Sequence, residues 1–315
     1  MSSNNNIKVF SGSSNPELAE KICKYLRIPL GLAKIDKFPD GEKLIKCEDD
    51  VRGKDCFVVQ SGCDPVDENL VEILIFLDCL KRASAMRVTA VIPYFSYARQ
   101  DRKDEGRVPI TAKLVSNLIT TAGADRVLAM DLHAAQLQGF FDIPVDHLFA
   151  EPVLTKYFQT KNLTNLTVVS PDVGNIKRAA RYVEHLNGEL AIIHKRRINS
   201  TEVQCGAIIG SVEGKDVLMC DDIISTAGTM CTAAKLVKEK GARKIYVGAT
   251  HGLFADKALE KIADAPIDEI VVTDTIPLKP AAKKFKNIKV LTVSDILGEA
   301  IKRIHSNESI SSMFT

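Results

Sequence analysis

The sequence predicts an α/β protein with two similar doubly wound domains whose sheets are mainly parallel. Short apolar runs rich in β-branched residues recur along the 315 residues, and helix-length segments separate most of them. Strands that are buried on both faces of a parallel sheet have such near-continuous apolar sequences. The predicted strands are 7–10, 56–60, 87–93 and 126–130 in the first half, and 166–170, 190–193, 216–220, 244–249 and 269–273 in the second.

Two of the segments between these runs have clear helical signals. Residues 66–81 are apolar on almost every side, which indicates a well-buried helix. The segment after Arg107 has Pro109 in its first turn and ends at Gly123, residue types that commonly begin and end a helix.

A weak internal repeat supports two similar halves. Residues 122–133 and 240–251 share a helix-ending Gly-Ala, a basic residue, a strand and a histidine. We predict one domain at 1–149 and a second at 150–315, because the periodic pattern breaks near 145–152. Whether the tail, about 300–315, packs back on the first domain stays open.

The composition excludes several classes of protein. Hydrophobic residues at 45% and charged residues at 26% are those of a globular chain, and a net charge of +2 argues against a nucleic-acid or membrane-surface partner. We see no apolar run of the roughly 18 residues that a membrane span needs and no secretory signal. Eight cysteines occur without a C-x-x-C pair, so we expect small core thiols in a reducing, cytoplasmic compartment.

The strongest chemical signal follows the predicted strand 216–220. Asp221 and Asp222 come directly after it, and a turn of small residues, 225–229, then opens a helix. Backbone N–H groups, hydroxyls and a helix N-terminus favour an oxyanion, and Gly228 permits close approach of the backbone. Carboxylates suit vicinal hydroxyls, so the pattern indicates a sugar phosphate. An ordinary capped helix after a strand is the alternative.

Two more polar clusters follow predicted strands. Asp131 and His133 are two positions apart, so they would point to the same side of an extended chain. A carboxylate and an imidazole fit a divalent metal, although a histidine in such a place is often only a structural hydrogen-bonding residue. Asp172 adds a carboxylate just after Pro171, which ends the strand 166–170.

Three further segments are ambiguous by themselves. Residues 38–42 (FPDGE) form a common type of turn, and residues 97–103 (YARQDRK) fit a solvated loop. Three cations within 194–198 (HKRRI) open a predicted loop of about ten residues and fit a surface patch. Guanidinium groups also suit polyphosphate, and a loop that carries Lys and Arg can close over reacting phosphates.

Together these motifs resemble those of ribose-phosphate pyrophosphokinases, also called phosphoribosyl pyrophosphate synthetases, and they follow that family's order along essentially the whole chain. The matching segments are 38–42, 93–103, 107–114, 130–146, 170–175, 194–198 and 221–229. The resemblance implies a phosphoribosyltransferase-like fold. It also implies transfer of the β,γ-diphosphoryl group of ATP to the C1 hydroxyl of ribose 5-phosphate, for nucleotide biosynthesis.

The resemblance also assigns roles to individual residues, with Mg²⁺ as the cofactor. It implies that ATP is bound by Phe38, Asp40, Glu42, Arg99, Gln100, Asp101 and His133. It implies that ribose 5-phosphate is bound by Arg197, Asp221, Asp222, Ser225, Thr226, Ala227, Gly228 and Thr229. The implied metal ligands are Asp131, His133 and Asp172, and the implied catalytic residues are Lys195 and Arg197.

The chain departs from the family pattern at three of these places. Ser225 stands where an aspartate is usual, so one carboxylate contact to the sugar is missing. Asn175 stands where a second glycine is usual; asparagine tolerates a left-handed backbone, but its side chain could crowd a ligand. His147 replaces a usual asparagine, which would perturb nucleotide regulation.

The tail resembles that of the phosphate-activated class of the family. Ser309, Ser311 and Phe314 occupy its characteristic positions, and with Arg107 the two serines would bind a regulatory phosphate at a subunit junction. On chemistry alone the tail is a frayed end. The resemblance implies a homohexamer, with inorganic phosphate as an activator.

Two alternatives to an active diphosphokinase remain open at this stage. A phosphoribosyltransferase would use the same sugar-phosphate loop, but the ATP motifs and the HKRRI segment count against it. A non-catalytic subunit that regulates a partner synthetase is supported only by Ser225 and Asn175.

Overall fold

The computed structural model describes residues 6–197 and 203–313. The chain divides into two compact units. The first unit comprises Met1–Phe149, Thr275–Pro277 and Thr292–Thr315, and the second comprises Ala150–Asp274 and Leu278–Leu291. No helix in the described ranges is both long enough and apolar enough to cross a membrane.

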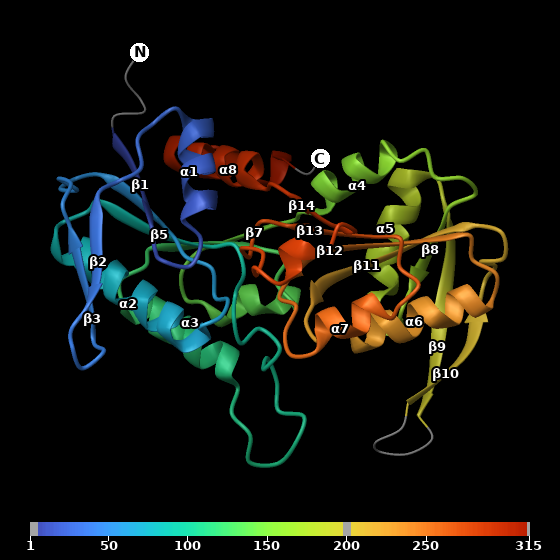
Figure 1. Cartoon of the computed structure of the whole chain (residues 1–315). Helices are drawn as coiled ribbons and strands as arrows, with labels where there is room; N and C mark the ends of the chain where they lie inside the picture. The colour runs from blue at the N-terminus through green and yellow to red at the C-terminus, as the bar shows by residue number, and fades with distance from the viewer. Residues whose placement is uncertain (1–5, 198–202, 314–315) are drawn as a thin grey trace. The chain divides into compact units, whose positions relative to one another are not determined.

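The first unit is built on a five-stranded sheet with the order β1-β4-β5-β6-β7, and every neighbouring pair is parallel (Figure 1). An antiparallel hairpin, β2–β3, stands apart from this sheet. The strands are β1 (Ile7–Ser11), β2 (Ala33–Lys37), β3 (Lys43–Cys47), β4 (Asp55–Val59), β5 (Arg87–Ile92), β6 (Arg126–Met130) and β7 (Val145–Leu148).

Helices cover both faces of this sheet (Figure 1). The helices are α1 (Pro16–Leu26), α2 (Val66–Arg82), α3 (Thr111–Thr121) and α8 (Ser294–Ser306), with short 3₁₀ helices at Ala135–Phe140 and Ser311–Met313. Helices α2 and α3 share one apolar core with the sheet, including Phe76 and Ile119. On the other face α1 packs against α8. Asn15 begins α1 by accepting a hydrogen bond from the backbone N–H of Leu18.

The second unit contains a seven-stranded sheet with the order β10-β9-β8-β11-β12-β13-β14, in which only β10 is antiparallel to its neighbour. The strands are β8 (Thr167–Ser170), β9 (Glu189–Arg197), β10 (Val203–Ile209), β11 (Asp216–Ile224), β12 (Lys244–Gly252), β13 (Glu269–Thr273) and β14 (Ile288–Leu291). The helices are α4 (Glu151–Gln159), α5 (Ile176–Leu186), α6 (Gly228–Glu239) and α7 (Ala258–Ala263), with 3₁₀ turns at Val173–Asn175 and Ala282–Lys284.

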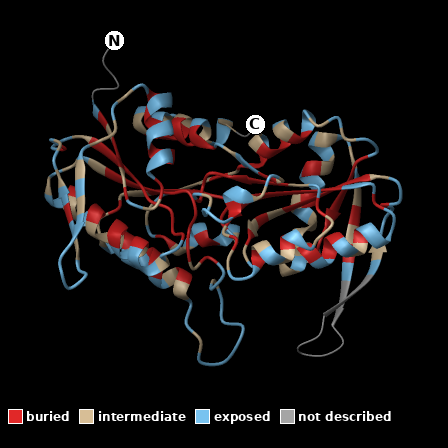
Figure 2. Cartoon of the chain, in the orientation of Figure 1, coloured by how far each residue is buried: buried red, intermediate tan, exposed pale blue. Residues whose placement is uncertain are grey.

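Alternate residues of β11 serve two different cores of the second unit. Val217 and Met219 lie in the core beneath α6 and α7, whereas Leu218 and Cys220 lie in the core beneath α4 and α5. The strand β8 and residues 216–220 of β11 are accordingly buried throughout, while the helices expose their outer faces (Figure 2). This two-sided burial explains the continuous apolar sequence from which the strand was predicted.

The predicted fold class is confirmed, and all nine predicted strands are present. The two repeated segments each connect the end of a helix to a parallel strand, from α3 to β6 and from α6 to β12. The predicted helix 66–81 corresponds to α2. The helix predicted after Arg107 corresponds to α3, but α3 begins at Thr111 with Ile110 as its N-cap, so Pro109 precedes the helix and does not lie in its first turn. Pro171 directly follows the last residue of β8, as expected.

Candidate active site

A pocket of about 300 Å³ in the first unit brings together four of the predicted ATP-binding residues. Arg99, Gln100 and Asp101 line it from the loop after β5, and His133 lines it from the loop after β6. Both loops follow the carboxyl ends of neighbouring parallel strands, where ligands bind in doubly wound sheets. Arg102 and Asp104 are the other charged residues that line this pocket. From the sequence alone, these two residues were not assigned to the nucleotide.

The chain does not stay extended from Asp131 to His133, so the condition under which the two side chains would share a side is not met. Strand β6 ends at Met130, and Asp131 has a left-handed backbone with a φ of 40°. The carboxylate of Asp131 is buried, whereas His133 is exposed. His147 stabilises this bend, because its Nε2 accepts a hydrogen bond of 2.9 Å from the backbone N–H of Leu132.

The predicted turn at 38–42 is confirmed as the tip of the β2–β3 hairpin. The backbone N–H of Phe38 donates to the carbonyl of Glu42 over 2.8 Å, and Oδ1 of Asp40 accepts from the N–H of Glu42. Gly41 supplies the positive φ of 95° that the turn requires. The side chains of Phe38, Asp40 and Glu42 are all exposed, so contacts to a nucleotide stay a prediction.

Paired carboxylates lie near the end of β11 in the second unit. The strand extends beyond the predicted 216–220 to Ile224, because Ile223 and Ile224 continue the ladder with β12. Asp221 and Asp222 therefore belong to the strand itself. Oδ1 of Asp221 accepts from the backbone N–H of Asp222 over 2.9 Å, and Arg178 lies 3.9 Å from Oδ1 of Asp222.

The electrostatic environment raises the pKa of Asp221. Removal from water is the largest cause, followed by the neighbouring carboxyl of Asp222, and together they raise its pKa from 3.8 to about 7. The amide of Asn175 and the guanidinium of Arg178 oppose this shift. A carboxylate with such a pKa near the end of a strand is typical of a functional site.

The small-residue turn after β11 leads directly into α6. Ala227 has a left-handed backbone with a φ of 57°, and α6 begins at Gly228 without a side-chain cap. The first N–H groups of the helix are therefore available to an anion. A Cβ built at Gly228 would lie 4.0 Å from the nearest atoms of the protein, so the space beside this residue is open, and close approach of an anion to its backbone stays a prediction.

Lys261 is a residue that sequence reasoning missed at this turn. Its Nζ donates to the carbonyl of Thr226 over 3.2 Å, and it would lie 4.0 Å from a Cβ built at Gly228. The ammonium group thus adds positive charge beside the uncapped end of α6. Lys261 lies on α7, more than 30 residues along the chain from the turn, so no local motif could reveal it.

Asp172 and Asn175 form the next turn of the second unit, after β8. Oδ1 of Asp172 accepts from the backbone N–H of Asn175 over 3.1 Å, and the side-chain Nδ2 of Asn175 donates to Oδ1 of Asp221 over 2.8 Å. The φ of Asn175 is −94°, so the left-handed backbone considered from sequence is not used there. The turn after β8 and the end of β11 are thus joined.

The segment 194–198 is not the start of a ten-residue loop. Strand β9 continues to Arg197 and pairs with β10, and Lys195 lies opposite Cys205 in this hairpin. Beyond Ile192 the strand β9 pairs with β10 and no longer with β8, and strand segments at the border of a sheet commonly carry charged residues, which hides them from a search for apolar runs. The connection at 198–202 lies outside the described residues, so closure over a substrate stays a prediction.

The predicted magnesium ligands come from both units. Among the described side chains, no group of three or more His, Cys, Asp or Glu residues is arranged to hold a metal ion. A bound Mg²⁺ would then take most of its ligands from water and substrate phosphates, as this cation usually does. The carboxylates of Asp131 and Asp172 suit such a hard cation better than the imidazole of His133.

The predicted regulatory residues are exposed. Ser309 and Ser311 lie after α8, where Nη1 of Arg303 donates to the carbonyl of Ser309 over 2.9 Å. Arg107 lies in the loop before α3 with a φ of 65°. Within residues 6–197 and 203–313, no hydrogen bond joins Arg107 to either serine. Phe314 lies outside the described residues.

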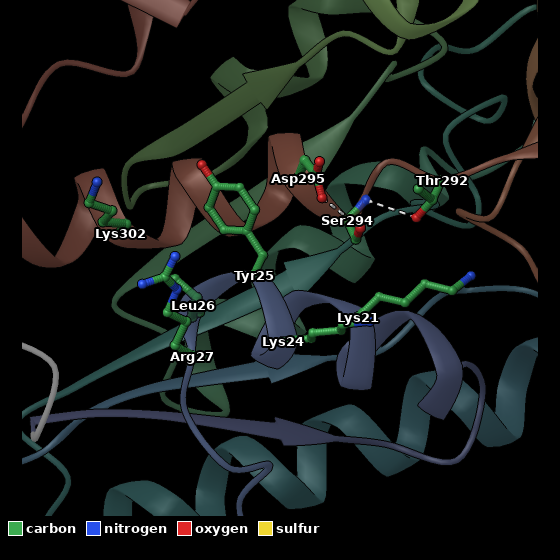
Figure 3. A pocket seen from close by; sticks show the side chains of 9 residues that line it. All are labelled: Lys21, Lys24, Tyr25, Leu26, Arg27, Thr292, Ser294, Asp295 and Lys302. Carbon is green, nitrogen blue, oxygen red and sulfur yellow. Dashed lines mark hydrogen bonds between the residues drawn. The ribbon is translucent and has the colours of Figure 1, made fainter.

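A larger groove of about 750 Å³ lies along α1 and α8 in the first unit (Figure 3). Its charged lining includes Lys21, Lys24, Arg27 and Lys302. The hydroxyl of Tyr25 donates to Glu299 over 2.9 Å and joins the two helices. The groove shares no residue with the predicted site.

Comparison with known proteins agrees with this architecture of two α/β units with parallel sheets. A family model described as the N-terminal domain of ribose phosphate pyrophosphokinase matches residues 7–123, and the phosphoribosyl synthetase-associated domain matches residues 198–315. A ribose-phosphate pyrophosphokinase from Rhodopirellula baltica is 57% identical over 311 residues, covering 98% of each chain. One from Campylobacter jejuni is 50% identical, again covering 98% of each chain.

Solved structures give the same result. The crystal structure of phosphoribosylpyrophosphate synthetase from Mycobacterium smegmatis matches with a TM-score of 0.90 and 39% identity, over 96% of this chain and 100% of that one. The chain therefore belongs to the ribose-phosphate pyrophosphokinase family.

Proposed function

We infer that this protein is an active ribose-phosphate diphosphokinase that converts ATP and D-ribose 5-phosphate into 5-phospho-α-D-ribose 1-diphosphate and AMP. The observation that carries this inference is full-length identity of 57% to a ribose-phosphate pyrophosphokinase. The product is an activated ribose donor, which suits a role in nucleotide biosynthesis.

In this reaction the C1 hydroxyl of the sugar attacks the β-phosphorus of ATP. A new O–P bond forms, the bond between the β-phosphorus and the α,β-bridging oxygen breaks, AMP leaves, and the hydroxyl proton is released. Such a transfer depends mainly on positioning and on stabilising negative charge. Mg²⁺, when bound with the polyphosphate, neutralises part of that charge.

We assign the sugar phosphate to the second unit. The residues 225–229 and the uncapped start of α6 would hold the 5-phosphate, and Asp221 and Asp222 would accept hydrogen bonds from the ribose hydroxyls. In the first unit the pocket of Arg99, Gln100, Asp101 and His133 would hold part of ATP, and the exposed ring of Phe38 would stack on its base.

The remaining roles complete the proposal. Lys195 and Arg197 would stabilise charge on the reacting phosphates, while Asp131, His133 and Asp172 would contribute to the magnesium site. Arg107, Ser309 and Ser311 would bind inorganic phosphate as an activator. We further propose a cytoplasmic homohexamer, the assembly that the family resemblance implies.

A direct test is the formation of AMP by the purified protein. With ATP and Mg²⁺, we expect AMP to appear only when ribose 5-phosphate is added, and faster with inorganic phosphate. Transfer of a ribosyl phosphate to a nucleobase would instead identify a phosphoribosyltransferase. Absence of turnover alone, with altered kinetics in a mixture with another synthetase, would identify a regulatory subunit.

A further inference from the structure

Asn175 contacts two of the candidate site carboxylates at once. Its backbone N–H donates to Oδ1 of Asp172 over 3.1 Å, and its side-chain Nδ2 donates to Oδ1 of Asp221 over 2.8 Å. The two aspartates belong to different segments, the turn after β8 and the strand β11. One residue therefore joins the two acidic parts of the second unit.

The backbone does not require an asparagine at this position. Asn175 precedes α5 with a φ of −94° and a ψ of 2°, which most residue types can adopt, and its side chain makes no cap to that helix. The side-chain amide of Asn175 therefore acts through its hydrogen bond to Asp221. Since the bond to Asp172 uses the backbone, the two contacts can be separated by mutation.

The amide also limits the freedom of the Asp221 carboxylate. Oδ1 of Asp221 accepts a second hydrogen bond, 2.9 Å from the backbone N–H of Asp222. Two donors on a single oxygen fix the rotation of the carboxyl group, because turning it would break both bonds.

We propose that Asn175 is a positioning residue for ribose 5-phosphate: its amide holds the carboxylate of Asp221 in the orientation that receives the sugar hydroxyls. This inference rests on the proposed function, in which Asp221 binds the ribose. Asn175 itself touches no reacting atom. Its effect is therefore expected in the binding of the sugar, and not in the binding of ATP or in the chemical step.

The decisive variant is Asn175→Ala, which keeps the backbone N–H to Asp172 and removes the amide from Asp221. We expect its KM for ribose 5-phosphate to rise about 10-fold, the scale of a lost hydrogen bond to a charged group, while kcat and the KM for ATP change less than about twofold. Asn175→Asp has nearly the same shape but places a carboxylate against Asp221, so its KM should rise further. Lys177→Ala, an exposed change two residues along, is the matched control.

Calorimetric binding of ribose 5-phosphate without ATP separates this inference from the proposed function. We expect wild-type protein and Lys177→Ala to bind the sugar equally, and Asn175→Ala to bind it about 10-fold more weakly with an unchanged melting temperature. Equal binding by Asn175→Ala would overturn the positioning role even if AMP formation is normal. A fall in kcat, a rise in both KM values and a fall in thermal stability together would also overturn it, since that pattern indicates that Asn175 has only a structural role. Failure of the wild-type protein to make AMP, with sugar binding retained, would reject the proposed function alone.

Discussion

Nδ1 of His305 lies 2.9 Å from Oδ2 of Asp55, 250 positions earlier in the chain. Asp55 has no exposed side-chain surface, and the guanidinium of Arg87 holds the same carboxylate through two nitrogens. Arg87 also donates to the carbonyl of Ile304 over 2.8 Å. The last helix, α8, is therefore anchored to β4 and β5 of the first unit, although the chain passes through the second unit before reaching it.

This anchor predicts a large loss of stability on removal of the buried carboxylate. We expect Asp55→Ala to lower the free energy of unfolding by about 3–5 kcal/mol, because the guanidinium of Arg87 loses the charge that compensates its burial and His305 loses a hydrogen-bond partner. Chemical denaturation followed by circular dichroism measures this. The control, Asp78→Ala, removes an exposed ion pair with Arg82 and should change stability far less, because water screens exposed charges. Similar losses in both variants would contradict the anchoring role.

The raised pKa of Asp221 predicts a stability that depends on pH. An acid whose pKa rises from 3.8 in the unfolded chain to about 7 in the folded one binds its proton more tightly when folded. Its contribution to stability therefore falls as the pH rises from about 4 to about 7, and stays low above that range. Asp221→Asn, which carries no charge, should remove this dependence.

The expected result is a melting temperature for Asp221→Asn about 1–2 °C above wild type at pH 8, the shift that about 1 kcal/mol causes in a chain of 315 residues. At pH 3, below both pKa values, the two proteins should melt together, since Asp221 is then protonated in the folded and in the unfolded state. Because all other groups titrate alike in the two proteins, a change with pH in the melting-temperature difference between variant and wild type reports on Asp221 alone. An equal difference at both would show that the pKa of Asp221 is not raised.

The sequence predicted the central strands well because burial on both faces leaves a local, apolar signature. The strands that it missed are at edges or in the hairpin. Strand β7 has three half-exposed residues, β14 exposes Lys289 and Val290, and β2 and β3 have polar residues on one face. Their stability comes from pairing with a neighbouring strand, which single-sequence patterns do not reveal.

In the candidate site, too, features formed by adjacent residues could be predicted from the sequence, whereas contacts between distant segments could not. The pairing of Asp221 with Asp222 and the turn into α6 could be predicted from adjacent residues. The link from Asn175 to Asp221 and the approach of Lys261 to Thr226 could not, because each joins segments that meet only in the folded sheet. The positive φ of Ala227 could not be predicted either, because alanine rarely adopts a left-handed backbone.

Lys261 provides a test of the phosphate site. We expect Lys261→Gln to raise the KM for ribose 5-phosphate about 5- to 10-fold with a smaller effect on ATP, because an ammonium group beside the start of α6 attracts the sugar's phosphate. Steady-state kinetics with each substrate varied measures this. Lys257→Gln, which changes an exposed lysine just before α7, the helix that carries Lys261, is the control. Equal effects of the two changes would mean that Lys261 contributes only general positive charge.

Lys195, on strand β9, provides a test of the catalytic role proposed for the β9–β10 hairpin. We expect Lys195→Ala to lower kcat by about 100- to 1000-fold, the usual cost of losing a group that stabilises transition-state charge, while the binding of ATP stays nearly unchanged. Single-turnover formation of AMP separates the chemical step from binding. Lys284→Ala changes the total charge equally at an exposed position and should keep full activity. A fall in kcat of only a few-fold would refute the transition-state role of Lys195.

Ser225 tests how closely the sugar-binding turn follows the family pattern. Ser225 comes directly after β11, and its carbonyl accepts from the N–H of Ala255, so the backbone there is fixed before the side chain is changed. Ser225→Asp adds a carboxylate that can accept a ribose hydroxyl, and we expect a KM for ribose 5-phosphate about 3- to 10-fold lower. Ser225→Asn has the same shape without the charge and should give a smaller gain. If Ser225→Asp leaves the KM unchanged or raises it, repulsion from Asp221 and Asp222 outweighs the new hydrogen bond, and this turn binds its sugar in another way.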